Sequence, residues 1–238
     1  MTRIRFSFAR RDALKHISHL DMMRLFQRAL RRSELPLAYS EGYNPHLRFN
    51  LAAPLPVNVT ASEELGEVFF SGTVTPDRFI SALSEQLPEG LILTGACSED
   101  YNAPSLPSFV NAALYRAALV AEEGCRVDLS KYRQALERLL AREEILAPRT
   151  KKKRKKTYVN VRPYIFEAYF KEPVKDTPLE LHMLLQAGSK GGVSPFFVIE
   201  QLEKELFCEC NYKAHWELHR ERLYREHEQF LQPLSEGM

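Results

Sequence analysis

Apolar and polar residues alternate at the start of the chain. Ile4, Phe6 and Phe8 are separated by Arg5 and Ser7, and Arg3 precedes Ile4. A period of two is typical of a half-buried strand, whose successive side chains point to opposite faces. We therefore predict a strand here, with its two arginines on the face opposite the apolar residues.

A helical period follows over residues 19–32. Ser18 precedes it and Asp21 comes three residues later, which is the spacing of a capping box at a helix N-terminus. Pro36 limits its C-terminal end. Two further strands are predicted near residues 49–54 and 65–71.

Thr75-Pro76 then opens a second helix, because proline is favoured in a first helical turn. Residues 91–97 form a closing strand. The predicted order is β-α-β-β-α-β, the order called ferredoxin-like.

The second half repeats this order loosely. Its predicted elements are, in chain order, a strand over 114–120, a helix over 130–142, strands over 163–170 and 179–187, a helix from Ser194 to 207, and a charged helix over 212–230. Prolines among small and polar residues indicate a linker at 105–111. We therefore predict an α+β protein with two tandem ferredoxin-like domains, 1–104 and 112–238, the second ending in a C-terminal helix.

Composition narrows the function classes only slightly. Lys and Arg number 33 against 31 acids, so net charge alone indicates no partner. No apolar run is long enough to span a membrane, and the N-terminus lacks the apolar core of a secretory signal. The four cysteines have no framework-like spacing. We expect a cytoplasmic protein with reduced thiols and no membrane contact.

Four arginines share one face of the first predicted helix. Arg24, Arg28, Arg31 and Arg32 stand at positions i, i+4, i+7 and i+8. Such a row suits contacts with phosphates or carboxylates. The alternative is an ordinary solvated helix face.

The loop after this helix combines aromatic and basic residues. Tyr39, Tyr43 and His46 offer flat rings for stacking, Gly42 permits a tight turn, and Arg48 adds a positive charge. Single-stranded RNA is often bound by stacking on aromatic rings beside cations. A structural loop plugged by its own aromatic residues explains the same pattern.

Residues 149–156 carry seven positive charges and no acid. A run of this kind repels itself unless an anion neutralises it. Nucleic acid is the commonest polyanion for such a loop, and its binding would be strongly dependent on salt. A loop that only improves solubility or protects a sheet edge is the alternative.

Histidines near the first helix raise the possibilities of metal binding and acid–base catalysis. His16, His19 and Asp21 lie within six residues, but the helix cap already accounts for Asp21. Cys208-x-Cys210 is tighter than the usual zinc spacing. We therefore expect no metal and no cofactor.

Three segments resemble the hallmark of the radical-SAM-linked bacterial domain, a family of unknown function. They are Ser18-His-Leu-Asp-Met-Met-Arg24, the stretch from Leu35 to His46, and Ala53-Pro-Leu-Pro-Val57. The resemblance covers the first hundred residues well, and the second half more loosely through 151–156 and Val161-Arg-Pro163. It implies a stand-alone partner of a radical SAM enzyme. The family's genes often lie near a ribonuclease of the E/G type, which implies a role connected with RNA.

Our leading hypothesis is a non-catalytic accessory protein of a radical SAM enzyme that binds RNA or a ribonucleoprotein. The expected contact residues are Arg3, Arg5, Arg24, Arg28, Tyr39, Tyr43, Arg48, Lys151, Lys152, Lys153, Arg154, Lys155 and Lys156. One alternative is a metal-independent endoribonuclease of the tandem ferredoxin-like type, with His16, His19 or His46 as general acid or base. The other is a scaffold that binds only protein.

Overall fold

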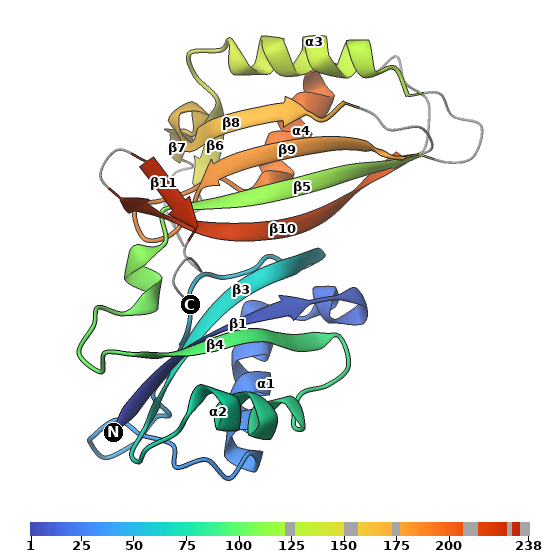
Figure 1. The fold of residues 1–238 in the computed structure, drawn as a ribbon. Coiled ribbons are helices and arrows are strands. Elements are labelled where there is room, and N and C mark those ends of the chain that lie inside the picture. Colours follow the sequence, from blue (N-terminus) through green and yellow to red (C-terminus); the bar gives the residue numbers. More distant parts are fainter. Residues whose placement is uncertain (122–126, 150–156, 173–176, 207–213, 228–229, 234–238) are drawn as a thin grey trace. The chain divides into compact units, whose positions relative to one another are not determined.

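The chain folds into two compact units. A computed structural model describes residues 1–121, 127–149, 157–172, 177–206, 214–227 and 230–233. Unit 1 comprises Met1–Asn111 and the described residues from His219 onward, and unit 2 comprises Ala112–Leu218. Both units are mixed α+β, with mostly antiparallel strands (Figure 1).

Unit 1 contains a β-α-β-β-α-β series. Its elements are β1 (Thr2–Arg10), α1 (His19–Arg32), β2 (Phe49–Leu51), β3 (Val59–Phe70), α2 (Pro76–Ser84) and β4 (Leu91–Glu99). The antiparallel strands lie in the order β4-β1-β3, and β2 also pairs with β3. A short 3₁₀ helix, η1 (Asp12–His16), precedes α1.

The capping residues expected from the sequence are confirmed for α1. The backbone N–H of Asp21 donates to Ser18 Oγ at 3.2 Å, and Ser18 Oγ donates to Asp21 Oδ2 at 2.7 Å. The buried side of the helix carries Met22, Phe26 and Leu30. Apolar burial on one side leaves the arginines of the other side in solvent.

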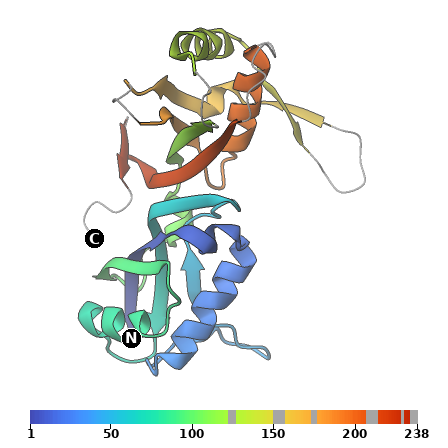
Figure 2. The same ribbon diagram turned by 90° about the vertical axis from the view of Figure 1, so that its right-hand side faces the viewer.

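Aromatic rings dominate the core of unit 1. Phe6 and Phe8 on β1 pack against Phe26 of α1, and Phe6 also contacts Phe49 and Phe79. The helices α1 and α2 cover this face of the sheet (Figure 2). The pattern at the N-terminus therefore predicts the core side of β1 correctly.

Unit 2 contains sheet strands, a hairpin and two α-helices. Its elements are β5 (Ala112–Ala121), α3 (Leu129–Leu140), β6 (Leu146–Arg149), β7 (Thr157–Asn160), β8 (Ile165–Phe170), β9 (Leu179–Gln186) and α4 (Pro195–Glu205). The sheet order is β5-β9-β8, and β6 pairs with β7 in a separate sheet. In β9, Leu179, Leu181, Met183 and Leu185 are all buried. They alternate with partly exposed residues, as the sequence predicts.

The predicted C-terminal helix over 212–230 is wrong. The described part of this segment contains a long strand, β10 (Ala214–His227), and β11 (Phe230–Pro233), which pairs with it. Burial alternates as far as Arg220, with Leu218 and Arg220 inside, and the next buried residue is Leu223 instead of Arg222. Because one inward position holds an arginine and the alternation shifts after it, the hydrophobicity pattern does not reveal a strand.

The course of β10 also alters the predicted domain limits. Its residues from His219 onward belong to unit 1, where β10 is a neighbour of β3. The predicted second domain, 112–238, is therefore divided between the two units. The predicted linker, 105–111, contains a 3₁₀ helix, η2 (Leu106–Phe109), whose first residue is buried. None of the described helices is long and apolar enough to cross a membrane.

Candidate nucleic-acid interface

A groove of about 600 Å³ runs along α1 in unit 1. One wall is the outer face of α1 and the other is formed by residues 85–88, which follow α2. Arg24, Arg28 and Arg32 line it, because residues four apart share one face of a helix. Three of the four arginines predicted to share one helix face are therefore part of a concave surface, and Arg31 is not among its lining residues.

The three arginines differ in their partners. Arg24 Nη1 donates to Asp21 Oδ1 at 3.0 Å. Hydrogen bonds from Ser18 and then from Arg24 lower the pKa of Asp21. Arg28 is exposed and makes no hydrogen bond or ion pair with any residue that the structure describes. Its charge contributes to lowering the pKa of Asp21, but its N–H groups donate to none of the described residues and can reach an external anion.

Arg32 joins the two walls. Its Nε donates to Gln86 Oε1 at 3.1 Å, and its Nη2 donates to the Gln86 carbonyl at 2.7 Å. These bonds fix the C-terminal end of α1 against the segment after α2. The lining thus holds three arginines against two acids, Asp21 and Glu85.

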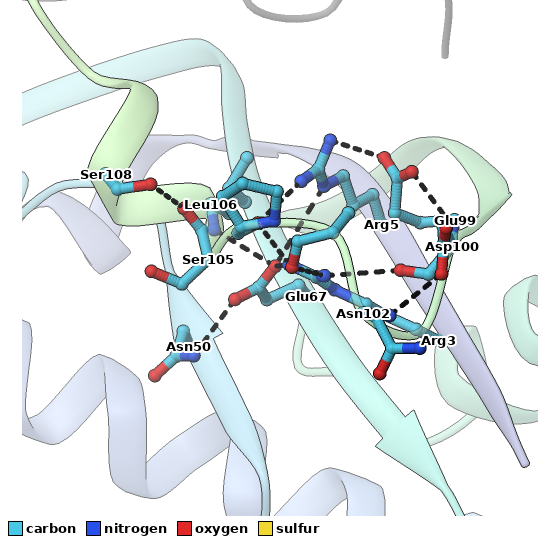
Figure 3. A network of polar contacts seen from close by, with 12 residues as sticks. Arg3, Arg5, Asn50, Glu67, Glu99, Asp100, Asn102, Ser105, Leu106 and Ser108 are labelled. Carbon is cyan, nitrogen blue, oxygen red and sulfur yellow. Dashed lines mark hydrogen bonds and ion pairs between the residues drawn. The ribbon is translucent and has the colours of Figure 1, made fainter.

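Arg3 lies in a buried network instead of on an exposed basic surface (Figure 3). Its guanidinium forms an ion pair with Glu67, and both side chains are almost completely buried. Glu67 also accepts hydrogen bonds from Asn50 Nδ2 at 3.0 Å and from the backbone N–H of Leu106 at 3.1 Å. The expected exposed position of Arg3 is corrected, because residues 100–106 cover that face of the strand.

Arg5 and Arg48 also contact side chains in or next to this covering segment. Arg5 forms an ion pair with Glu99, and its guanidinium lies 5.2 Å from the centre of the Phe109 ring. Arg48 donates to the Tyr101 hydroxyl, and its guanidinium lies 4.1 Å from the centre of the Phe69 ring. These cations stabilise the packing of the segment against the sheet.

The loop over residues 39–47 is closed by its own backbone. Tyr39 forms an isolated bridge with Leu47, and the Ser40 N–H donates to the His46 carbonyl at 2.8 Å. Tyr43 at the tip is 100% exposed. The loop projects from the body of unit 1 (Figure 2). Of the aromatic residues predicted to stack, Tyr43 is thus the most accessible.

The three candidate catalytic histidines lie on different elements. His16 ends η1, and its Nδ1 lies 2.9 Å from Asn58 Oδ1. His19 begins α1, and His46 is in the loop. Among the described residues, no group of three or more His, Cys, Asp or Glu side chains is placed to hold a metal ion.

Sequence reasoning missed a buried charged cluster beside His19. Arg220 Nε donates to Glu64 Oε1 at 2.6 Å, and both side chains are nearly inaccessible. Arg10 donates to the Val59 carbonyl at 3.1 Å, and burial lowers its pKa to about 10. Burial and the charge of Arg220 lower the pKa of His19. No local pattern reveals the cluster, since Glu64 and Arg220 are 156 residues apart.

Some predicted features lie outside the described residues. They include the core of the basic run, namely Lys151, Lys152, Lys153, Arg154, Lys155 and Lys156, and the cysteines Cys125, Cys208 and Cys210. Cys97 is described and is a free thiol.

Comparisons with known proteins indicate the family. A crystal structure entitled as that of an unknown protein from Galdieria sulphuraria is similar to the chain at 13% sequence identity, over 91% of this chain and 98% of that chain. The TM-score is 0.26, which is too low to indicate a shared fold or function. No curated protein matches the chain. The model of a family described as uncharacterized proteins conserved in bacteria matches residues 3–195. The chain therefore belongs to this bacterial family, DUF2344.

Proposed function

We propose that this protein is a non-catalytic accessory protein that binds RNA through the groove along α1. The observation that carries the proposal is Arg28, an exposed arginine between Arg24 and Arg32 whose guanidinium makes no hydrogen bond or ion pair with the described residues. Helix geometry separates the three arginines by steps of about 6 Å along the axis. A row of evenly spaced cations suits a polymer with a regularly repeated negative charge.

Two further features support RNA as that polymer. The exposed ring of Tyr43 is available for stacking on an unpaired base. The run at 151–156 adds six cations to the chain. Aromatic rings beside cations are the usual components of single-stranded nucleic-acid sites.

The proposal is tested by titrating the full chain into a labelled single-stranded RNA and measuring fluorescence anisotropy. Replacing Arg28 by Gln is expected to weaken binding about three- to tenfold, since one charge-assisted contact is lost at an exposed site. The loss should be similar for RNAs of different sequence, because phosphates carry no sequence information.

Arg78→Gln is the matched control. Arg78 is an exposed arginine of α2 that does not line the groove. The substitution makes the same change in net charge and is expected to alter the Kd less than twofold. Equal losses in the two variants would mean that RNA responds only to overall charge, and the groove would then not be the site.

We further propose that unit 1 is a ferredoxin-like domain and that a radical SAM enzyme of the cytoplasm is the protein partner. The element order of unit 1 and the resemblance of Ser18–Arg24 to the radical-SAM-linked domain support these two points. The test is to co-purify a tagged radical SAM enzyme with the chain after nuclease treatment. Retention would indicate a direct protein contact, and loss would indicate that RNA bridges the two proteins.

A further inference from the structure

We propose that unit 2 contains a separate binding site for one nucleoside monophosphate, either free or as the terminal nucleotide of an RNA. The site is a pocket of about 310 Å³ between the β6–β7 hairpin and the loop over residues 188–192. This volume lies at the lower end of the usual range for small-molecule sites, about 300–1,000 Å³. It therefore suits a single nucleotide better than a dinucleotide cofactor.

The hairpin supplies the apolar side of the pocket. Pro148, Val159 and Val161 line it, and the pairing of β6 with β7 holds the first two of these residues in place. The ring of Tyr164 adds an aromatic surface. A planar base could pack against these groups, and apolar and aromatic side chains are the common lining of such sites.

The Tyr164 hydroxyl has no hydrogen bond to any residue that the structure describes. An ideal Cβ on Gly191 would lie 3.4 Å from this oxygen, so the glycine loop passes close to it. A phenol next to exposed backbone is available to bind the edge of a base or a ribose hydroxyl.

The glycine loop has a fixed shape. Gly191 has a φ of +106°, which side chains rarely adopt, and a Cβ on Gly192 would lie 2.6 Å from the Gln186 carbonyl oxygen. The Gln186 side chain donates to the Lys190 carbonyl at 3.3 Å, and its backbone carbonyl accepts from Val193 N at 3.4 Å. Both glycines are thus required for a loop that borders the pocket with backbone instead of side chains.

Positive charge lies at the rim. Arg149 and Lys190 line the pocket, and none of the described residues that line it is acidic. Arg149 is exposed and forms no ion pair with the described part of the chain. A ligand with a planar body and one anionic end fits this division between apolar wall and cationic rim, and a nucleoside monophosphate has that form.

The experiment is calorimetric titration of the full chain with AMP, GMP, CMP and UMP, with the matching nucleosides and inorganic phosphate as separate probes. At least one monophosphate is expected to bind saturably and more tightly than its nucleoside. Tyr164→Phe should weaken that binding about two- to tenfold. Arg149→Gln should weaken it about tenfold or more and remove the preference for the phosphorylated form.

Arg133→Gln is the control, since Arg133 lies on α3 of the same unit and pairs with Glu172 outside the pocket. RNA oligomers with phosphorylated or hydroxyl ends distinguish a free nucleotide from the terminal nucleotide of an RNA as the ligand. Binding of free monophosphates assigns the free nucleotide, and binding that requires a phosphorylated RNA end assigns the terminal nucleotide. Absence of saturable binding to every probe, or equal affinities in all variants, overturns the proposal.

This site does not depend on the groove along α1. Arg28→Gln is expected to leave monophosphate binding unchanged, because Arg28 is not among the residues that line this pocket. Loss of RNA affinity in that variant with normal nucleotide binding would support both sites. Normal RNA affinity with nucleotide binding intact would reject only the groove.

Discussion

At the residue scale, Gly66 shows how one missing side chain positions the core of unit 1. It is paired with Phe6 across β1 and β3, and an ideal Cβ on it would overlap with the Phe6 ring. Phe6 is completely buried, so its ring has little room to move. The glycine is therefore required by the ring that lies over it.

We predict that Gly66→Ala destabilises the protein by about 1–3 kcal/mol, because the added methyl group overpacks the core. Urea unfolding measures the effect. Gly72→Ala is the control, since its Cβ would meet only Pro36, at 3.4 Å. The double variant Phe6→Leu with Gly66→Ala should recover part of the stability lost in Gly66→Ala. No recovery would mean that overlap with the Phe6 ring does not cause the destabilisation.

His19 is expected to make stability depend on pH. Burial and the neighbouring Arg220 lower its pKa below 6.5 in the folded protein. The unfolded chain therefore takes up the proton first as the pH falls. The stability associated with neutral His19 is present above pH 6.5 and decreases as the pH falls toward the folded-state pKa. Unfolding of the wild type between pH 7 and 5 should thus depend more steeply on pH than that of His19→Gln, and identical slopes would contradict this assignment.

At the element scale, two ion pairs connect β10 to β3, and one of them is much more buried than the other. Arg220 and Glu64 are buried. Arg222 and Glu63 are partly exposed, and Arg222 Nε lies 2.9 Å from Glu63 Oε2. Arg220 also donates to the Pro54 carbonyl at 3.0 Å. The buried pair therefore joins β10 to β3 and to the segment before it.

We predict that Arg220→Met destabilises the protein by about 3–5 kcal/mol, because Glu64 loses its paired cation inside the protein. Arg222→Met should change stability by less than about 1 kcal/mol, as exposed pairs do. Chemical unfolding of both variants tests the contrast. The double variant Arg220→Met with Glu64→Gln should be more stable than Arg220→Met alone. Equal losses of stability in Arg220→Met and Arg222→Met would show that burial of the ion pair does not determine its contribution to stability.

The same elements show what the sequence can predict. The range of α1, its cap and its arginine face follow from local spacing, and so does the alternation in β9. The strand nature of β10 does not, because Arg220 stands at an inward position and its partner is far away in the chain. Likewise, the sequence pattern places Arg3 on the outer face of its strand, but residues 100–106 cover this face in the folded protein. Local patterns identify a face, but tertiary contacts decide whether it is solvated.

At the scale of the whole molecule, the positive charges of the proposed RNA interface are far apart in the sequence. The groove along α1 belongs to unit 1, and the basic run at 151–156 falls within the sequence of unit 2. One RNA bound by both regions would release counterions from both. The salt dependence of the affinity then reports how many regions take part.

We predict that the slope of log K against log salt falls by about 0.7–0.9 for each phosphate contact removed. Arg28→Gln should reduce it by about one contact, and replacing the six cations of 151–156 by Ser should reduce it by several. If both regions bind the same RNA molecule, the reductions add in the combined variant. If the run serves only for solubility, its replacement leaves the slope unchanged while Arg28→Gln still lowers it. An unchanged slope in all three variants would exclude an electrostatic RNA interface, because phosphate binding without counterion release contradicts the physics of a charged polymer.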